Sequence, residues 1–250
     1  MTLTRADLLS HKPLIIAGPC AAETRERVIE IGEKVKAAGA HMYRVGLWKP
    51  RTNPDSFQGV GVEGLAWLKE LKEKTGLLIA TEVMEIDHIA ATKDIVDVLW
   101  VGARNMQNFS LLKALRDDPR PVMLKRGFIA TVKEWIGAAD YIGRERVILV
   151  ERGIRTGADS TRFTLDLNAA LVMKTDYGMP VVVDPSHPAG RSDLVPGLSL
   201  AAIAAGLDGV MVEVHTYPME SLGDTEQQLT PGEFETLVSR IQALTKALYV

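Results

Sequence analysis

Basic side chains gather in one short stretch of the sequence, RVGLWKPRTNPDSFQG, which runs from Arg44 to Gly59. Others follow apolar runs elsewhere, although the formal net charge of the chain is -3, so the clustering is local. Arginine binds phosphate and carboxylate oxygens through paired hydrogen bonds, and lysine supplies a point charge. More than one anionic group is therefore expected to bind to these residues: Arg44, Lys49, Arg51, Arg104, Lys125 and Arg152.

A second set of side chains has the chemistry of a metal site. It consists of one thiol, one imidazole and two carboxylates: Cys20, His187, Glu213 and Asp224. Such mixed ligands suit manganese, iron, cobalt or zinc. Two alternatives remain open, since a lone cysteine is often simply buried and His187 fits a hydrogen-bonded loop histidine. In the same way, single cations could pair with Glu82, Glu151 or Asp184.

The elements that must position these residues alternate along the chain. Near-continuous apolar runs are typical of parallel strands that are covered on both faces. Eight such runs begin at Pro13, Met42, Leu77, Val98, Val122, Val147, Val181 and Gly209. Helical patterns are expected at 25–38, 62–75, 85–93, 109–116, 131–141, 162–174, 198–205 and from Thr230, a candidate N-cap, onward. This order predicts an α/β fold, a single (β/α)8 TIM barrel, with a doubly wound open sheet as the alternative.

In a (β/α)8 barrel the functional site lies at the carboxyl ends of the strands. Each expected strand end carries a polar or metal-binding residue: Cys20, Lys49, Glu82, Arg104, Lys125, Arg152, His187 and Glu213. By contrast, GVGVEG at 59–64 matches a dinucleotide-binding pattern but does not leave a strand directly. We interpret it as a turn into a helix.

The composition indicates a globular protein, with 250 residues, 46% hydrophobic and 24% charged. The negative net charge argues against binding to nucleic acid or to an anionic membrane. There is a single cysteine, no signal-peptide pattern and no apolar run long enough to span a membrane. A cytoplasmic location is the simplest expectation.

Seven motifs in order carry a resemblance to a known family. They are AGPC at 17–20, KPRT at 49–52, GARNMQN at 102–108, LKRG at 124–127, ERGIRT at 151–156, VDPSH at 183–187 and VEVH at 212–215, followed by Asp224 and Gln227. On these residues the chain closely resembles the type I 3-deoxy-D-arabino-heptulosonate 7-phosphate (DAHP) synthases of the β subgroup. The similarity extends over nearly all of residues 13–245.

The resemblance implies a metal-dependent barrel that condenses phosphoenolpyruvate with erythrose 4-phosphate in the shikimate pathway. It implies that Cys20, His187, Glu213 and Asp224 bind the metal, with Mn²⁺ expected first. Around phosphoenolpyruvate it implies Arg44, Lys49, Arg104, Lys125 and Arg152, and around the sugar phosphate Arg51 and Thr52. Lys49, Cys20 and His187 are the expected catalytic residues.

The resemblance also suggests rivals and partners. A sibling enzyme makes 3-deoxy-D-manno-octulosonate 8-phosphate, but it typically has KANRS and DVTH where this chain has KPRT and DPSH. Other rivals are a silent barrel that regulates a partner enzyme and an unrelated phosphosugar isomerase. We expect residues 1–250 to form one catalytic domain with no appended regulatory or chorismate mutase domain. A homo-oligomer, dimer or tetramer, is expected, and chorismate mutase is a candidate partner.

Overall fold

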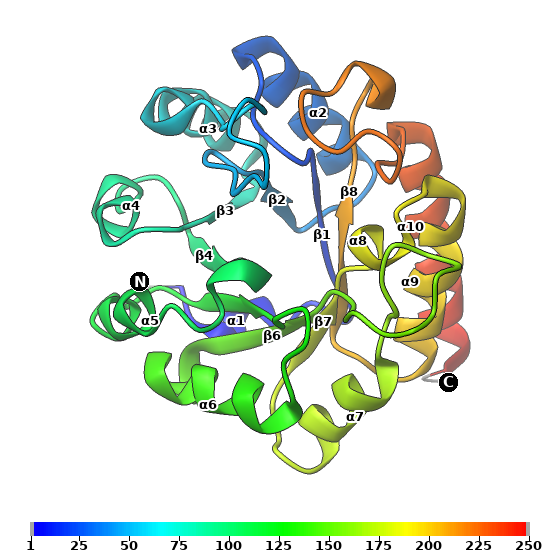
Figure 1. The fold of residues 1–250 in the computed structure, drawn as a ribbon. Helices are drawn as coiled ribbons and strands as arrows, with labels where there is room; N and C mark the ends of the chain where they lie inside the picture. The colour runs from blue at the N-terminus through cyan, green and yellow to red at the C-terminus, as the bar shows by residue number, and fades with distance from the viewer. Residues whose placement is uncertain (1–2, 249–250) are drawn as a thin grey trace.

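Eight parallel strands close into a barrel, as Figure 1 shows. Each strand pairs with the next along the chain, and β1 pairs with β8, so the sheet has no open edge. The predicted (β/α)8 barrel is confirmed, and the open sheet is excluded. The computed structural model describes residues 3–248. The strands are β1 Leu14–Gly18, β2 Met42–Arg44, β3 Leu78–Glu82, β4 Val98–Val101, β5 Val122–Lys125, β6 Val147–Glu151, β7 Val181–Val183 and β8 Gly209–Glu213.

Helices surround the strands and shield their outer face from water (Figure 1). The α-helices are α1 Arg5–Leu8, α2 Arg25–Ala37, α3 Gly64–Thr75, α4 Ile86–Ala91, α5 Phe109–Arg116, α6 Val132–Ile142, α7 Leu167–Thr175, α8 Ser186–Ala189, α9 Val195–Ala204 and α10 Pro231–Leu248. Short 3₁₀ turns are η1 Gly61–Glu63, η2 Ala103–Asn105, η3 Arg144–Arg146, η4 Ser192–Leu194 and η5 Pro218–Glu220. No helix within residues 3–248 has the length and apolar character needed to cross a bilayer.

Apolar side chains form two cores because successive residues of a strand point to opposite faces. On the outer face, Tyr43 and Leu149 join the helices in a large cluster. On the inner face, Met42, Trp100 and Ile148 fill the barrel itself. The apolar runs are continuous rather than alternating because both faces are buried. The strand ends are consequently held on a rigid frame.

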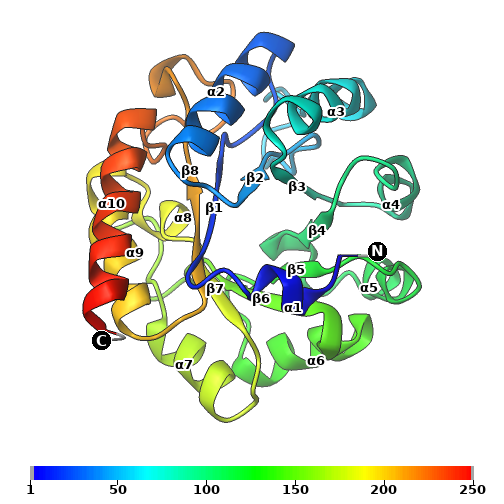
Figure 2. The same cartoon turned by 180° about the vertical axis from the view of Figure 1, so that it is seen from behind.

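The end of the barrel opposite the carboxyl ends of the strands is closed by α1, which Figure 2 shows in front of the strands. Leu8 of this helix is fully buried in the inner core. Near this end a cavity of about 490 Å³ lies among Leu9, Pro13, Ile203 and Leu207. Its wall is largely apolar and holds none of the predicted site residues. The predicted site residues lie at the other end of the barrel.

Most predicted helices are confirmed to within a few residues, but one begins later than expected. The helix expected from 162 begins at Leu167 instead, because Asp166 caps it by accepting a hydrogen bond from the Ala169 N–H (3.0 Å). Residues 153–165 form a loop, in which Ile154 pairs with Thr164. The GVGVEG stretch is a 3₁₀ turn that enters α3, as expected. At the last helix, Thr230 and Glu233 form the predicted reciprocal cap.

Candidate active site

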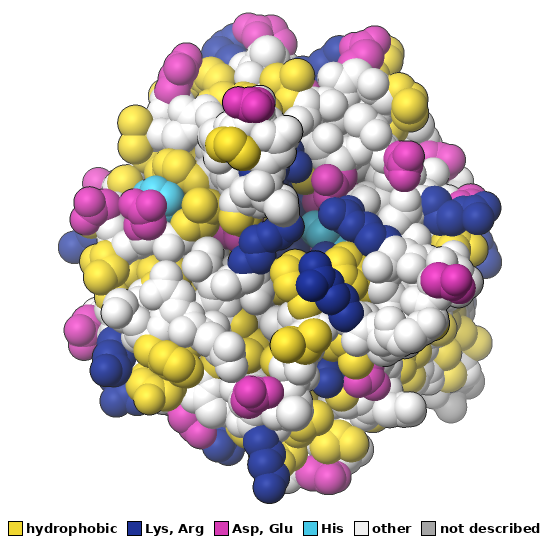
Figure 3. All heavy atoms as spheres, viewed as in Figure 1, with side chains coloured by type: hydrophobic (Ala, Val, Ile, Leu, Met, Phe, Trp, Pro, Cys, Tyr) yellow, Lys and Arg dark blue, Asp and Glu magenta, His cyan; other side chains and the backbone are white. Residues whose placement is uncertain are grey.

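The carboxyl ends of the strands surround a cavity of about 480 Å³. Figure 3 shows lysine and arginine side chains around a hollow near the middle of this face, with a histidine between them. Every residue predicted to bind an anion lines this cavity: Arg44, Lys49, Arg51, Thr52, Arg104, Lys125 and Arg152. His187 and Asp224 line it as well. The separate cations of the sequence thus lie in one place.

Lys125, the last residue of β5, forms a buried ion pair with Asp184, whose Oδ2 atom accepts a hydrogen bond from Nζ at 2.7 Å. Lys125 is therefore one of the cations that pair with a carboxylate, an alternative that the sequence left open. Burial lowers the pKa of Lys125 more than Asp184 raises it. Burial acts to raise the pKa of Asp184, but His187 and Lys125 outweigh it and hold the pKa well below its usual value. Asp184 is thus a fixed anion beneath the cavity.

Arg152, which follows β6, is only 4% exposed. Although it is buried, it has no carboxylate partner among residues 3–248. Its guanidinium donates to the Gly153 carbonyl at 3.4 Å. Burial lowers its pKa to about 10, against the opposing effect of Asp184. The group therefore stays charged at neutral pH. A buried cation with free N–H donors favours an anionic ligand.

Two phenyl rings hold Arg152 in place instead of an acid. Phe128 and Phe163 are stacked, with ring centroids 5.3 Å apart and planes 7° from parallel. The Arg152 guanidinium lies 4.9 Å from the first centroid and 4.3 Å from the second. Three further arginines lie within 6 Å of one of the two rings: Arg104, Arg155 and Arg162. Ring faces attract cations but leave their N–H groups free to donate.

Glu151, another carboxylate considered as a partner of the cavity cations, pairs with Arg126 at 3.1 Å. Burial raises the pKa of Glu151 although Arg126 opposes the change. Arg126 also pairs with Asp166 at 2.8 Å and donates to the Ala130 carbonyl. This pair lies outside the cavity lining and fixes the loops behind it. It leaves the neighbouring Arg152 free.

Arg44 and Lys49 connect the cation cluster to the predicted metal site. Arg44 Nη1 donates to Glu213 Oε1 at 2.6 Å, while its buried Nε has no hydrogen-bond partner. Lys49 Nζ lies 3.1 Å from Cys20 Sγ and donates to the Cys20 carbonyl at 2.9 Å. Burial lowers the pKa of Lys49, but Cys20, Glu82 and Glu213 together outweigh it, so the pKa is raised. Lys49 is therefore an ammonium ion at neutral pH.

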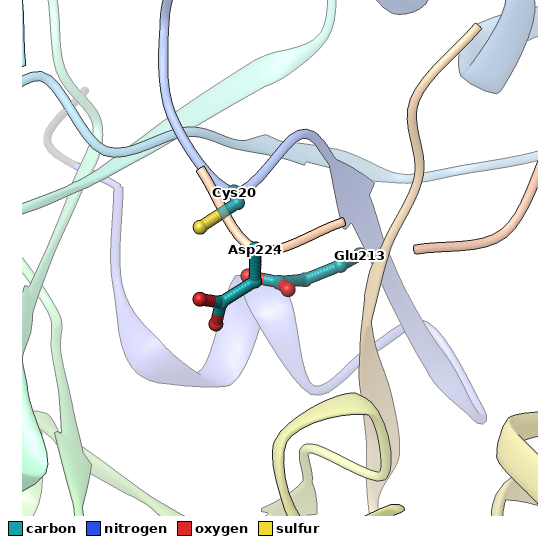
Figure 4. Close-up of side chains that lie close together, drawn as sticks. All are labelled: Cys20, Glu213 and Asp224. Atoms are coloured by element: carbon teal, nitrogen blue, oxygen red, sulfur yellow. The ribbon is translucent and has the colours of Figure 1, made fainter. Parts of the chain in front are cut away.

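Three of the four predicted metal-binding residues lie together. Single donor atoms of Cys20, Glu213 and Asp224 are all within 4.8 Å of one another. Figure 4 shows the two carboxylates next to each other, beside the sulfur atom. Oxygen and sulfur donors lie about 2.0–2.3 Å from a bound transition metal, so opposite ligands are up to about 4.5 Å apart. The group fits one metal ion with small adjustments.

His187, the fourth predicted ligand, lies on the first turn after β7 and is not within 4.8 Å of all three other donors. Its Nε2 atom is 3.7 Å from Glu213 Oε1, so it borders the group. Its Nδ1 atom is 2.7 Å from Asp184 Oδ2, although the contact is not aligned as a hydrogen bond. Burial lowers the pKa of His187 against the effect of both acids. A carboxylate behind a histidine is common in metal sites, where it orients the ring.

Arg51 and Thr52, predicted to hold the sugar phosphate, lie at the outer part of the cavity. Arg51 donates to the carbonyl groups of Phe57 (3.1 Å) and Leu222 (3.3 Å). Its Nη1 atom is 3.7 Å from Asp224 Oδ1. Thr52 is exposed on the loop that follows β2. Arg51 therefore lies next to Asp224, one of the predicted metal-binding residues.

Comparisons with known proteins identify the family. The sequence profile described as the DAHP synthetase I family matches residues 9–249. The chain belongs to this family. Over 239 residues it is 44% identical to a phospho-2-dehydro-3-deoxyheptonate aldolase of Thermotoga maritima, covering 94% of this chain and 71% of that protein.

Solved structures support the family assignment. The crystal structure of the Thermotoga maritima phospho-2-dehydro-3-deoxyheptonate aldolase (DAHP synthase) superposes with a TM-score of 0.89 at 43% identity, covering 94% of this chain and 69% of that one. A relative named for the sibling activity has a lower sequence identity to this chain. A 2-dehydro-3-deoxyphosphooctonate aldolase of Desulfatibacillum aliphaticivorans is 34% identical, covering 94% of this chain and 92% of that protein.

For this member of the DAHP synthetase I family, sequence reasoning missed several residues that line the cavity or support it. Arg155 belongs to the ERGIRT motif, but it was not predicted to bind a substrate. Arg162 and Phe163 were expected on a helix, whereas they line the cavity from the loop before α7. Their place in the loop was signalled only by Asp166, a preferred N-cap residue. The supporting position of Asp184 behind His187 had no signal in the sequence, because the contact depends on side-chain direction. His215, the last residue of the VEVH motif, lies with its Nε2 atom 3.3 Å from Glu23 Oε2.

Proposed function

We propose that this chain condenses phosphoenolpyruvate with D-erythrose 4-phosphate and water to give DAHP and phosphate, the first step of the shikimate pathway. Family membership carries this assignment. The observation that supports it best is that Arg152, which is buried with free N–H donors, lines the same cavity as Asp224 of the thiol–carboxylate group. In this reaction C3 of phosphoenolpyruvate forms a bond with the aldehyde carbon of the sugar. Water adds at C2, and the C2–O bond to phosphate breaks.

Phosphoenolpyruvate is assigned to the inner part of the cavity, where Arg152, Lys125, Arg104 and Lys49 supply positive charge. Arg152 would bind the phosphate, since its donors are free and it is held by aromatic rings. Two phosphorylated substrates repel one another, and fixed cations offset that repulsion while holding the reacting carbons close. Arg44 supports the same end through its ion pair with Glu213 (2.6 Å).

A divalent metal would be held by Cys20, Glu213 and Asp224, with His187 as the fourth ligand after a small movement. The donor set of one thiolate, one imidazole and two carboxylates suits Mn²⁺, Fe²⁺, Co²⁺ or Zn²⁺. When bound, the metal supplies Lewis-acid polarisation of the aldehyde carbonyl. Burial and Glu213 raise the pKa of the Cys20 thiol, and Lys49 acts against them. A bound cation would lower the pKa of the thiol, as Lys49 does, and would thereby stabilise the thiolate.

Lys49 is the proposed proton donor near the new C–C bond. Its ammonium group lies at the boundary between the phosphoenolpyruvate end and the metal group, 3.1 Å from the Cys20 sulfur. Because its pKa is raised, it carries a proton at neutral pH and can neutralise charge that develops on the former aldehyde oxygen. Arg51 and Thr52 are assigned to the phosphate of the sugar.

The remaining expectations about assembly and location are also proposals. We place the protein in the cytoplasm, which the single cysteine supports. Residues 1–250 are proposed to act as one catalytic domain. Association into a dimer or tetramer is proposed as well. Light scattering would measure the assembly, and the same method with added chorismate mutase would detect that candidate partner.

Phosphate release from phosphoenolpyruvate tests the function. The assay is run on metal-stripped and Mn²⁺-loaded protein, with erythrose 4-phosphate, with arabinose 5-phosphate and without a sugar. We expect release only with Mn²⁺ and the four-carbon sugar. Preference for the five-carbon sugar would identify the sibling activity, and full activity after exhaustive chelation would contradict metal dependence.

A further inference from the structure

The loop between β8 and α10 carries Asp224 together with two buried glutamines, Gln227 and Gln228. The loop is closed at its base, where Val214 pairs with Leu229. The Leu229 N–H donates to the Glu213 carbonyl at 2.8 Å, and the His215 N–H donates to the Leu229 carbonyl at 2.9 Å. The glutamines are therefore held next to the end of β8. They are 2% and 1% exposed, which is unusual for uncharged polar side chains outside a core.

Gln227 connects the two carboxylates of the proposed metal group. Its amide nitrogen donates to Glu213 Oε2 at 2.8 Å and to Asp224 Oδ2 at 2.8 Å. Its amide oxygen accepts from Arg162 Nη1 at 3.0 Å. Both amide hydrogens and the oxygen thus have partners, and the rotation of the side chain is set. The two carboxylates are tied to one another through a single neutral group.

Gln228 connects the thiol to the same loop, but through the main chain. Its Oε1 atom accepts a hydrogen bond from the Cys20 N–H at 3.0 Å. Its Nε2 atom donates to the Asp224 carbonyl at 2.5 Å. The backbone at Cys20 is thereby joined to the backbone at Asp224, although the hydrogen bond to Cys20 spans 208 residues of sequence. Together the two glutamines contact all three residues of the group.

We propose that Gln227 and Gln228 are positioning residues that hold Cys20, Glu213 and Asp224 in the arrangement that binds the metal. The proposal rests on the proposed function. Two buried carboxylates side by side repel one another, and an N–H donor shared between them offsets that repulsion. A lysine in place of Gln227 would neutralise the site, and an acid would add to the repulsion. A neutral amide orients both carboxylates and leaves their charge available to the cation.

A structural role alone makes a different prediction. If the glutamines only closed the loop, replacing them would lower the stability of the metal-free protein and leave its metal affinity unchanged. A positioning role predicts weaker metal binding, since removal of a hydrogen-bonding partner of a metal ligand typically reduces the affinity about 10- to 100-fold. Metal affinity, measured directly, separates the two roles.

The experiment compares wild-type protein with Gln227→Met, Gln228→Met and, as a matched control, Gln242→Met on the exposed side of α10. Mn²⁺ dissociation constants are measured on metal-stripped protein by electron paramagnetic resonance. Absorption of the Co²⁺-loaded protein in the near ultraviolet reports bonding to the Cys20 thiolate. We expect a roughly 10- to 100-fold weaker affinity and a weaker thiolate band in the two loop variants. The control should match wild type.

Gln227→Asn serves as a second variant because it keeps a polar amide that fits the space but is too short to reach both carboxylates. Its Mn²⁺ affinity should also fall. Affinities within twofold of wild type in the loop variants, with a thiolate band in every protein, would overturn the positioning role alone. Absence of a thiolate band in wild-type protein would remove the proposed metal site and this inference with it.

Discussion

Lys49 Nζ lies 3.1 Å from the sulfur of Cys20 and 2.9 Å from its carbonyl oxygen. The two residues follow neighbouring strands, β1 and β2, so the parallel pairing of these strands brings them together. One is assigned to phosphoenolpyruvate and the other to the metal. The contact therefore makes the two halves of the proposed site physically continuous, and each half can be tested by itself.

Replacement of Cys20 should remove the metal half. Cys20→Ala takes away the proposed thiolate ligand, and we expect Mn²⁺ affinity and metal-dependent turnover to fall by roughly 100-fold or more. Since only a small side chain is lost, circular dichroism should still show a folded barrel. Electron paramagnetic resonance and the phosphate-release assay measure the two losses. Tight Mn²⁺ retention with full activity would contradict the assignment.

Replacement of Lys125 should affect the two substrates differently. Lys125→Met keeps much of the side-chain volume but leaves Asp184 buried without its ion pair (2.7 Å in the native protein). We expect KM for phosphoenolpyruvate to rise about 10- to 100-fold, as for loss of a charged hydrogen bond, with a much smaller change for erythrose 4-phosphate. Lys93→Met, at an exposed position on the loop after α4, is the control. Equal losses for both substrates would speak against the proposed role.

Phe163 should matter although it carries no charge. Phe163→Leu removes the ring that lies 4.3 Å from the Arg152 guanidinium. A cation–π contact contributes about 0.5–2 kcal/mol, so KM for phosphoenolpyruvate should rise roughly 2- to 30-fold while kcat changes little. Phe109→Leu, on the exposed side of α5, is the matched control. An unchanged KM in steady-state assays would show that the ring does not position Arg152.

His41 should make the stability of the barrel depend on pH. Its Nδ1 atom accepts a hydrogen bond from the Ile15 N–H at 3.0 Å, and its ring stacks on His11. Burial, together with His11 and Lys36, lowers its pKa to about 4, from about 6.5 when unfolded. Between these values the unfolded chain binds more protons, so the free energy of unfolding falls as the pH falls.

The slope for one proton is at most about 1.4 kcal/mol per pH unit, and less here because the ring is partly exposed. Urea denaturation at about pH 7 and about pH 5 measures the change. His41→Asn, whose side-chain oxygen can accept the same hydrogen bond, should lose less stability over this interval than wild type. If both proteins lose the same amount, His41 does not titrate as its surroundings predict.

Local sequence patterns were sufficient for the order of the elements. Continuous apolar runs predicted the strands because both faces of a barrel strand are buried, and a reciprocal cap at Thr230 predicted the start of α10. The residue at each strand end could be named because parallel strands in a barrel present their carboxyl ends at one face. This explains why the predicted anion-binding residues all line the same cavity.

Only the tertiary structure decided which of these side chains touch. The pairing of Lys125 with Asp184, the aromatic support of Arg152 and the link from Gln228 to Cys20 join residues on separate loops, and their distances depend on loop path and side-chain rotation. A local pattern contains no information about either. Sequence alone therefore determined the set of chemical groups at the end of the barrel, and folding determined their contacts.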